Sequence, residues 1–365
     1  MIERSWPLPT LQHMQRLTDN CGIIQHARFW LPHYSTGYCI DDNSRALIAA
    51  YRYYRLFGDA VAHELTIRYL SFINYAQRPD GNVRNFVDYN RTFLETEGSP
   101  DSLGRTIWAL GYLATAKERY LCIPAEEMQR HAIPHFQQCS EAHALAYGLL
   151  GLCALSEDTR WRDNALQWAH PPALALLAKY HDTHDSDWDW FLPELTYGNA
   201  RLPEALFSAG QMLVNNEMMD IGLRTLDFLN RVCYQRGYLS VVGSMGWYPR
   251  DGVCAEFDQQ PIDAGAMVEA NLAAYRLTQR EEYFENAVMA MDWFYGKNVQ
   301  GVPLYNELSG GCHDGLHSQG ANANQGAEST LAHLMAQICM YQTAPQLFVV
   351  AIPEMPVEDD YRRKW

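Results

Sequence analysis

Long hydrophobic runs, an excess of positive charge and paired cysteine motifs are all missing from this 365-residue sequence. Its longest apolar runs, such as 347–352, fall far short of the ~20 residues that a membrane-spanning helix needs. Asp and Glu number 43 against 28 Lys and Arg, so the formal net charge is −15. Nucleic-acid binding requires a basic surface that neutralises phosphates. We therefore expect neither membrane insertion nor a nucleic-acid partner.

Several motifs that define common enzyme classes are also missing. The sequence has no P-loop, no GxGxxG, no GxSxG and no HExxH. The nine cysteines are odd in number and scattered, which favours reduced thiols in a cytoplasmic protein over disulfides or a zinc framework. The first seven residues lack a basic region followed by an apolar block, so we expect no signal peptide there. The sequence predicts no metal and no cofactor.

Aromatic residues, by contrast, are abundant and often stand beside polar ones. There are 10 Trp and 22 Tyr. Trp188 and Trp190 flank an aspartate, and Tyr197 is followed by a glycine and Asn199. Aromatic faces beside hydrogen-bonding groups suit sugar rings, whose C–H faces are apolar and whose edges carry hydroxyls. We predict that these four residues bind a sugar; the alternative is that the aromatic ones simply pack the core.

Most of the chain has the apolar periodicity of amphipathic helices. About twelve helices are predicted, and they form hairpins with a short connection inside each pair and long irregular segments before several pairs. Short strands are possible at 238–242. The predicted helices cover 7–19, 42–57, 60–77, 101–119, 124–137, 141–155, 159–181, 203–214, 218–233, 261–278, 281–297 and 324–341.

This alternation predicts an all-α fold, the (α/α)6 toroid, in which six helical hairpins form a double ring. Short connections make antiparallel neighbours, and long irregular loops in compact domains are commonly functional. The long loops precede residues 101, 203, 261 and 324, so a ring would gather them on one face. A helical solenoid is the rival, but the repeats lack the motif residues of the solenoid families. We expect one domain over 1–365, with a C-terminal tail from about 343.

Polar and acidic residues gather where two of the predicted helices begin. One carboxylate suffices to cap a helix N-terminus, yet the helix at 42 has two at its start, with an asparagine and an arginine after them. The helix at 101 begins with an aspartate and has an arginine one turn later. Helix capping with a local ion pair is the alternative interpretation. We predict site roles for Asp41, Asp42, Asn43, Arg45, Asp101 and Arg105.

Three later loops carry similar groups. Glu194 follows a run of aromatic residues, where burial would raise its pKa and suit it to proton donation. The densest cluster of carboxylates and amides leads into the helix at 261, and its members are Glu256, Asp258, Gln259, Gln260 and Asp263. Glycines flank His313 and Asp314 and permit close approach of a ligand. Asn324 and Glu328 lie on one helical face.

Five segments of the chain together resemble bacterial proteins of the six-hairpin glycosidase-like class. They are 41–47, 101–105, 195–203, 257–264 and 324–330, and the resemblance covers about 20–345. It implies the toroid fold and a carbohydrate ligand. Similar regions occur fused behind glycosyltransferase domains or beside mannoside-active phosphorylases and hydrolases, which implies a functional link to a glycosyltransferase or a glycoside phosphorylase.

Our leading hypothesis is a glycoside hydrolase that cleaves a short oligosaccharide, with a mannoside as one option. Asp263 and Glu194 are the candidates for the acid, and Asp42 or Asp101 for the base. Related toroid enzymes favour inversion, which requires carboxyl groups ~6.5–9.5 Å apart. The remaining candidate residues would bind the substrate. A sugar epimerase or isomerase, and a non-catalytic glycan-binding accessory of a glycosyltransferase, are the alternatives.

Overall fold

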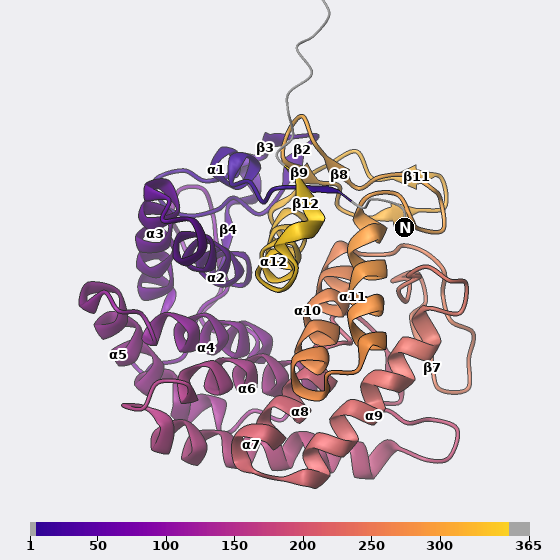
Figure 1. Ribbon diagram of the computed structural model, residues 1–365. Coiled ribbons are helices and arrows are strands. Elements are labelled where there is room, and N and C mark those ends of the chain that lie inside the picture. The colour runs from indigo at the N-terminus through magenta and orange to yellow at the C-terminus, as the bar shows by residue number, and fades with distance from the viewer. Residues whose placement is uncertain (1–4, 350–365) are drawn as a thin grey trace, which may run out of the picture.

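The computed structural model describes residues 5–349, and within that range the chain forms twelve α-helices. They form two rings (Figure 1). The inner ring consists of α2 (Ile40–Phe57), α4 (Pro100–Ala114), α6 (Ala142–Ser156), α8 (Arg201–Leu213), α10 (Pro261–Thr278) and α12 (Ala327–Thr343). The outer helices are α1 (Gln12–Leu17), α3 (Ala60–Ala76), α5 (Arg119–Phe136), α7 (Arg162–Thr183), α9 (Asn216–Cys233) and α11 (Glu281–Phe294).

Each inner helix packs against the next, and α12 returns to α2. The outer helices from α3 to α11 each pack against the inner helix that precedes them, and α1 packs against α12. This arrangement confirms the predicted (α/α)6 toroid. The inner helices are buried on nearly every side, whereas an outer helix such as α9 buries one stripe, as expected for two concentric layers.

The join between two helices of a hairpin shows how the sequence makes these sharp turns. Gly58 ends α2 in the left-handed conformation at φ 65°, which glycine adopts without a steric penalty. The Asp59 side chain then accepts a hydrogen bond from the Ala62 N–H and starts α3. Two residues therefore reverse the chain.

Glycines also allow two inner helices to approach closely. A Cβ atom added to Gly111 of α4 would lie 2.2 Å from the backbone oxygen of Gly151 in α6. One added to Gly151 would lie 2.4 Å from the oxygen of Ile107. Larger residues at these positions would force α4 and α6 apart.

The two ends of the described chain close the ring. Strand β1 (Trp6–Pro7) pairs in parallel with β12 (Phe348–Val349), which follows the short 3-10 helix η2 (Pro345–Leu347). The tail that we expected from about 343 therefore begins as part of the fold, and its remainder, 350–365, lies outside the described residues. The N-terminal helix α1 is shorter than the predicted 7–19, since Pro7 belongs to this strand pair and Thr18 is already extended.

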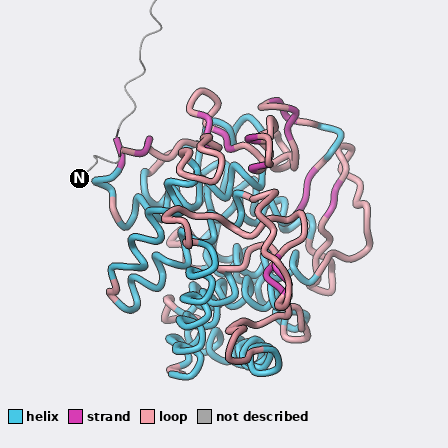
Figure 2. Tube along the Cα trace, turned by 90° about the vertical axis from the view of Figure 1, so that its right-hand side faces the viewer, coloured by secondary structure: helices cyan, strands magenta, loops and turns pink. Residues whose placement is uncertain are grey.

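The remaining strands are two-residue pairs within the long loops. They are β2 (Ala27–Arg28) with β3 (Leu31–Pro32), β4 (Tyr38–Cys39) with β5 (Phe86–Val87), β6 (Glu194–Leu195) with β7 (Tyr248–Pro249), β8 (Tyr305–Asn306) with β9 (Gly311–Cys312), and β10 (Leu316–His317) with β11 (Gly320–Ala321). Figure 2 shows most loop and strand segments gathered on one side of the helices. This gathering confirms the predicted loop face.

Some predicted boundaries were wrong. The strands expected at 238–242 are absent from this part of the described chain, where Leu239, Val241 and Val242 are buried in irregular backbone. The helix predicted over 101–119 ends at Ala114, and α5 begins at Arg119, before the predicted 124. None of the described helices is long and apolar enough to cross a membrane.

Candidate functional site

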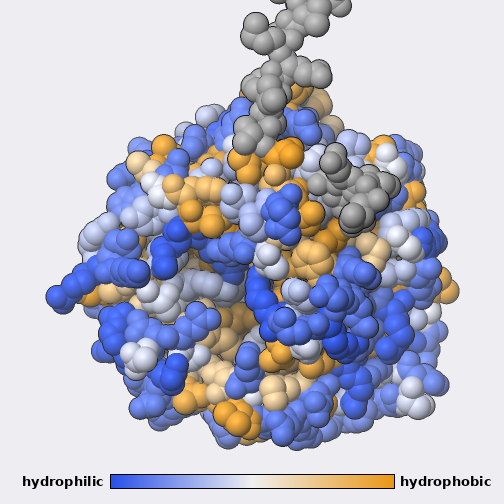
Figure 3. All heavy atoms as spheres, viewed as in Figure 1, coloured by the Kyte–Doolittle hydropathy of each residue, from blue (hydrophilic) through white to orange (hydrophobic). Residues whose placement is uncertain are grey.

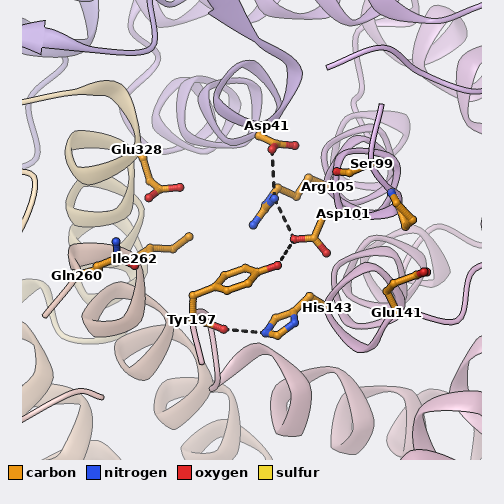
Figure 4. A pocket seen from close by; sticks show the side chains of 11 residues that line it. Asp41, Ser99, Asp101, Arg105, Glu141, His143, Tyr197, Gln260, Ile262 and Glu328 are labelled. Carbon is orange, nitrogen blue, oxygen red and sulfur yellow. Dashed lines mark hydrogen bonds and ion pairs between the residues drawn. The ribbon is translucent and has the colours of Figure 1, made fainter. Parts of the chain in front are cut away.

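A cavity of about 600 Å³ opens on the loop face, where several inner helices begin. Side chains from all six inner helices, or from the loops that precede them, converge on it (Figure 4). The lining residues are Asp41, Ser99, Pro100, Asp101, Arg105, Glu141, His143, Tyr197, Gln260, Ile262 and Glu328. The site is therefore rich in carboxylates and has one arginine and one histidine in its wall.

Arg105 is the centre of the polar network in this cavity. Its Nη1 atom lies 3.2 Å from Oδ2 of Asp101 and 3.3 Å from Oδ2 of Asp41. The two carboxylate oxygens are therefore no farther apart than the sum of these distances. The guanidinium carbon also lies 4.5 Å from the centre of the Tyr147 ring, a cation–π contact that helps to hold the Arg105 side chain.

Asp101 has a second donor in Tyr197, whose hydroxyl lies 2.5 Å from Oδ2. Burial, together with the charge of Asp101 nearby, raises the pKa of Tyr197, so the phenol stays protonated and donates. The Tyr197 carbonyl in turn accepts a hydrogen bond of 2.7 Å from Nε2 of His143, and the two rings stack at 4.3 Å. Burial lowers the pKa of His143, which keeps the imidazole neutral with its lone pair on Nδ1.

A second ion-pair chain reaches the cavity from the direction of α2 and α12. Arg45 binds Asp42 at 2.8 Å and Glu328 at 2.9 Å. Burial raises the pKa of Asp42 to about 6, although the Arg45 charge opposes this shift. Glu328 is half-exposed and lies across the cavity from Asp101 (Figure 4). Asp42 itself is buried behind the cavity wall.

Asp263, one of the two acid candidates from the sequence, is also buried behind the wall, beside the lining residue Ile262. Burial raises its pKa to about 8, against the effect of hydrogen bonds from the backbone N–H groups of Gly198 and Asn199. Its Oδ2 atom has no hydrogen-bond partner. Asp263 is thus a protonated carboxyl at neutral pH, as an acid must be, but it does not line the cavity as the structure stands.

The predicted environment of Glu194 was wrong. It lies exposed on β6 and is not buried among aromatic residues, because the neighbouring side chains Phe191 and Leu195 turn inward instead. Trp188 and Trp190 are buried core residues and do not reach the cavity. Trp188 donates to the Leu192 carbonyl at 2.7 Å.

Other predicted binding residues hold the loops in place. Asn43 donates to the Cys39 carbonyl at 2.8 Å. The Asn199 side chain accepts from the Thr196 N–H and donates to the Thr196 carbonyl. Asp314 accepts from the Gly326 N–H and the Ser329 hydroxyl at the start of α12, and Asn324 accepts from the Phe29 N–H. These contacts explain their polarity without a ligand.

The polar cluster before α10 likewise has one residue that lines the cavity and others that make contacts elsewhere. Gln260 lines the cavity. Gln259 is buried and bonds Trp293 and Ser240. Glu256 pairs with Arg236 and Asp258 pairs with His317, both outside the cavity wall. His313 is partly buried and outside that wall, with Nδ1 lacking a partner.

Five lining residues were not predicted from the sequence: Ser99, Pro100, Glu141, His143 and Ile262. His143 stands inside a helix, where a lone histidine is more often structural than functional. A signal was nevertheless available. Glu141 and His143 stand at the start of α6, as Asp101 and Arg105 stand near the start of α4. The predicted ring therefore already placed all four residues on the loop face.

A second cavity, of about 470 Å³, opens where the inner helices end. Figure 3 shows this face, which is hollowed near its middle. The charged groups there are largely paired: Glu269 accepts from Arg52 at 2.7 Å and also from Arg201, which binds Glu204 at 2.7 Å. In residues 5–349 no group of three or more His, Cys, Asp and Glu side chains is placed to hold a metal ion.

Comparison with known proteins gives a likeness in structure. No protein-family model matches the chain, and no curated protein matches it in sequence. A D-mannose isomerase structure aligns with TM-score 0.72 at 12% identity, covering 91% of this chain and 96% of the other. Cellobiose 2-epimerase from Bacillus thermoamylovorans aligns with TM-score 0.69 at 12% identity and the same coverage. A family 76 α-mannanase from Bacteroides thetaiotaomicron aligns with TM-score 0.58 at 13% identity, covering 84% and 88%.

These similarities establish a fold shared with carbohydrate enzymes of the six-hairpin toroid class. The chain is similar to isomerases, epimerases and hydrolases alike. Proteins that share a fold catalyse different reactions, so the residues of the cavity determine the function.

Proposed function

We propose that this protein is a carbohydrate-active enzyme, a glycoside hydrolase that cleaves a short oligosaccharide. One observation carries the proposal. Carboxylates from four different inner-helix N-termini, Asp41, Asp101, Glu141 and Glu328, converge on a single polar cavity. Glycoside hydrolysis requires two carboxyl groups on either side of the bond to be broken.

Asp101 is the proposed base, or the nucleophile if the reaction retains configuration. Arg105 and the Tyr197 hydroxyl both donate to it and fix its orientation. Asp41 is a poor proton donor, because it shares the Arg105 guanidinium with Asp101 and a carboxyl paired with arginine favours its charged form. Its separation from Asp101 also does not exceed the lower end of the ~6.5–9.5 Å that inversion needs. The acid therefore comes from another part of the cavity.

Two carboxyl groups are proposed for the proton donor. Glu328 faces Asp101 across the cavity but is ion-paired with Arg45. Asp263 holds its proton at neutral pH and has an unpartnered oxygen, but it must gain access past Ile262. A variant that lacks the proton donor should keep turnover only on substrates with a good leaving group. A variant that lacks the base should lose turnover on every substrate, so the two roles can be distinguished.

The test compares four variants on manno-, gluco- and galacto-oligosaccharides by proton NMR. Asp101→Asn should abolish cleavage of every substrate. Of Glu328→Gln and Asp263→Asn, the variant of the true acid should keep cleavage of aryl glycosides and lose that of oligosaccharides. Glu256→Gln is the matched control, since that carboxylate pairs with Arg236 outside the cavity. Wild-type rates in Asp101→Asn would refute the proposal.

A sugar epimerase or isomerase is the second candidate, and His143 is the observation that favours it. Such enzymes move a proton at the carbon beside a carbonyl and need a positioned base. His143 lines the cavity as a neutral imidazole with a free lone pair on Nδ1. Reaction in D₂O distinguishes the candidates, because isomerisation places deuterium on the sugar carbon and hydrolysis does not.

The mannoside preference and the functional link to a glycosyltransferase or a glycoside phosphorylase remain predictions from resemblance. A non-catalytic glycan-binding role predicts binding without any product, and the same NMR panel tests it.

A further inference from the structure

Exposed aromatic side chains are concentrated on two loop segments beside the cavity. Eight aromatic residues are exposed within residues 5–349. Five of them form what we call the aromatic rim: Phe29, Trp30, Tyr34, Phe86 and Tyr89, which are 40–51% exposed. Contiguous apolar groups on a protein surface commonly mark a binding site.

Hydrogen bonds attach one half of the aromatic rim to the start of α12. The Phe29 N–H donates to Oδ1 of Asn324 at 2.9 Å, and the Gln325 N–H donates to the Phe29 carbonyl at 2.8 Å. Glu328, which lines the cavity, follows three residues after Gln325. Phe29 and Trp30 therefore stand next to the α12 side of the cavity.

The other half is attached to the start of α2. Phe86 pairs with Cys39 across the β4–β5 ladder, and its neighbour Asn85 donates to Oδ2 of Asp41 at 3.2 Å. Directly paired residues project to the same face of a ladder. Phe86 is therefore on the side of Cys39, whose side chain caps α2. Because α12 and α2 are neighbours in the ring, the rim continues the cavity wall outward between them.

The rim aromatics are held in place before any ligand arrives. Phe29 has φ 57°, a left-handed conformation that non-glycine residues seldom adopt. The Tyr34 and Tyr89 rings lie 5.0 Å apart, and Tyr89 stacks on the buried Tyr38 at 6.3 Å. Prearranged side chains lose little conformational entropy on binding.

We infer that the protein binds a saccharide chain longer than its cavity holds and that the outer sugar units stack on the aromatic rim. The inference rests on the proposed function, since the rim extends the same cavity. Flat aromatic faces match the C–H faces of pyranose rings, and the cavity-lining carboxylates Asp41 and Glu328, next to the two halves of the rim, accept from hydroxyls. The substrate class is therefore a linear oligosaccharide with more sugar units than the cavity holds, not a free disaccharide.

The experiment measures affinity against chain length in the Asp101→Asn background, so that no ligand is consumed. Isothermal titration uses manno- and gluco-oligosaccharides of two to six units, supported by electrophoresis in gels that contain mannan or glucan. The probes are Trp30→Ala and Phe86→Ala. Tyr120→Ala is the matched control, because Tyr120 is an exposed aromatic at the start of α5, on the opposite face.

We expect affinity to rise with each added unit and the longest chains to bind about tenfold more weakly in each rim variant. Affinity for the disaccharide should not change, and Tyr120→Ala should match the parent at every length. Equal affinity of the parent and the rim variants for all lengths would overturn the inference and leave the proposed function intact. Absence of binding of any saccharide would overturn both. A dimer that dissociates on Trp30→Ala substitution would assign the rim to a second copy of the chain and also overturn the inference.

Discussion

The Tyr197 hydroxyl lies 2.5 Å from the Asp101 carboxylate, although the two residues are 96 positions apart in the chain. Tyr197 arrives from the loop before α8, and Asp101 from the first turn of α4. The contact joins helices that are separated in the ring by α6. The contact therefore forms only in the closed toroid, and the orientation of the Asp101 carboxylate depends on the whole fold.

Tyr197→Phe removes only the hydroxyl that holds Asp101. A hydrogen bond to a charged group contributes about 1.5–3 kcal/mol, so kcat/KM should fall about 10- to 100-fold. Arg105 remains in place, and the thermal unfolding temperature should change little. Tyr54→Phe is the control, because it breaks a comparable contact of 3.2 Å with Glu118 far from the cavity. Equal rates in both variants would show that Asp101 does not need Tyr197.

His143→Gln separates the two enzymatic candidates. Glutamine still donates to the Tyr197 carbonyl, so a hydrolase should lose no more than about tenfold in turnover. If His143 were a catalytic base, the loss would be about 10²- to 10⁴-fold. Steady-state kinetics on the substrate found by NMR measure the difference, and a loss of the larger size would favour the isomerase.

Glu269→Gln tests the buried charge network at the second cavity. Glu269 accepts from both Arg52 and Arg201, and all three side chains are largely buried. Removing its charge leaves two guanidinium groups without their shared partner, which costs about 3–5 kcal/mol in the free energy of unfolding. Urea denaturation provides the measurement. Glu282→Gln, which breaks an exposed pair with Arg280, should cost less than about 1 kcal/mol.

Asp263→Asn should change how stability depends on pH. The pKa of Asp263 is about 8 in the folded protein, whereas an aspartate in an unfolded chain titrates near 3.9. Between these values the folded state holds one more proton than the unfolded state. The stabilisation from this proton is therefore complete below pH 3.9, declines as the pH rises, and is gone above about 8.

The asparagine variant lacks this titration, so its stability relative to the wild type should increase with pH. The gain should be about 2.5 kcal/mol between pH 5 and pH 7, since one pH unit corresponds to about 1.4 kcal/mol. Urea denaturation at both pH values measures it. A difference that does not change with pH would mean that Asp263 is ionised in the folded state.

Helical periodicity was sufficient to predict the fold. The apolar stripes of the helices and the turn at Gly58-Asp59 are local features, so they can be read from neighbouring residues. The alternation of short and long connections then placed the loops on one face. The strand pair of Trp6 with Phe348 was not predictable, because it joins opposite ends of the chain.

The site was predicted only in part. Asp41, Asp101, Arg105, Tyr197, Gln260 and Glu328 do line the cavity. Trp188, Trp190 and Gln259 have the same polar and aromatic context in the sequence, yet they are buried in the core. Side-chain direction within an irregular loop depends on contacts with other loops, such as β6 with β7, and sequence patterns do not encode these contacts.

The most direct test of the account is a proton NMR time course of the wild-type protein and Asp101→Asn with the oligosaccharide panel. The account predicts a new anomeric signal from a shortened chain with the wild type, and none with the variant. The initial α or β form of that signal then distinguishes inversion from retention. A new sugar of unchanged chain length, or saccharide binding without any product, would contradict the central claim that this cavity hydrolyses a glycosidic bond.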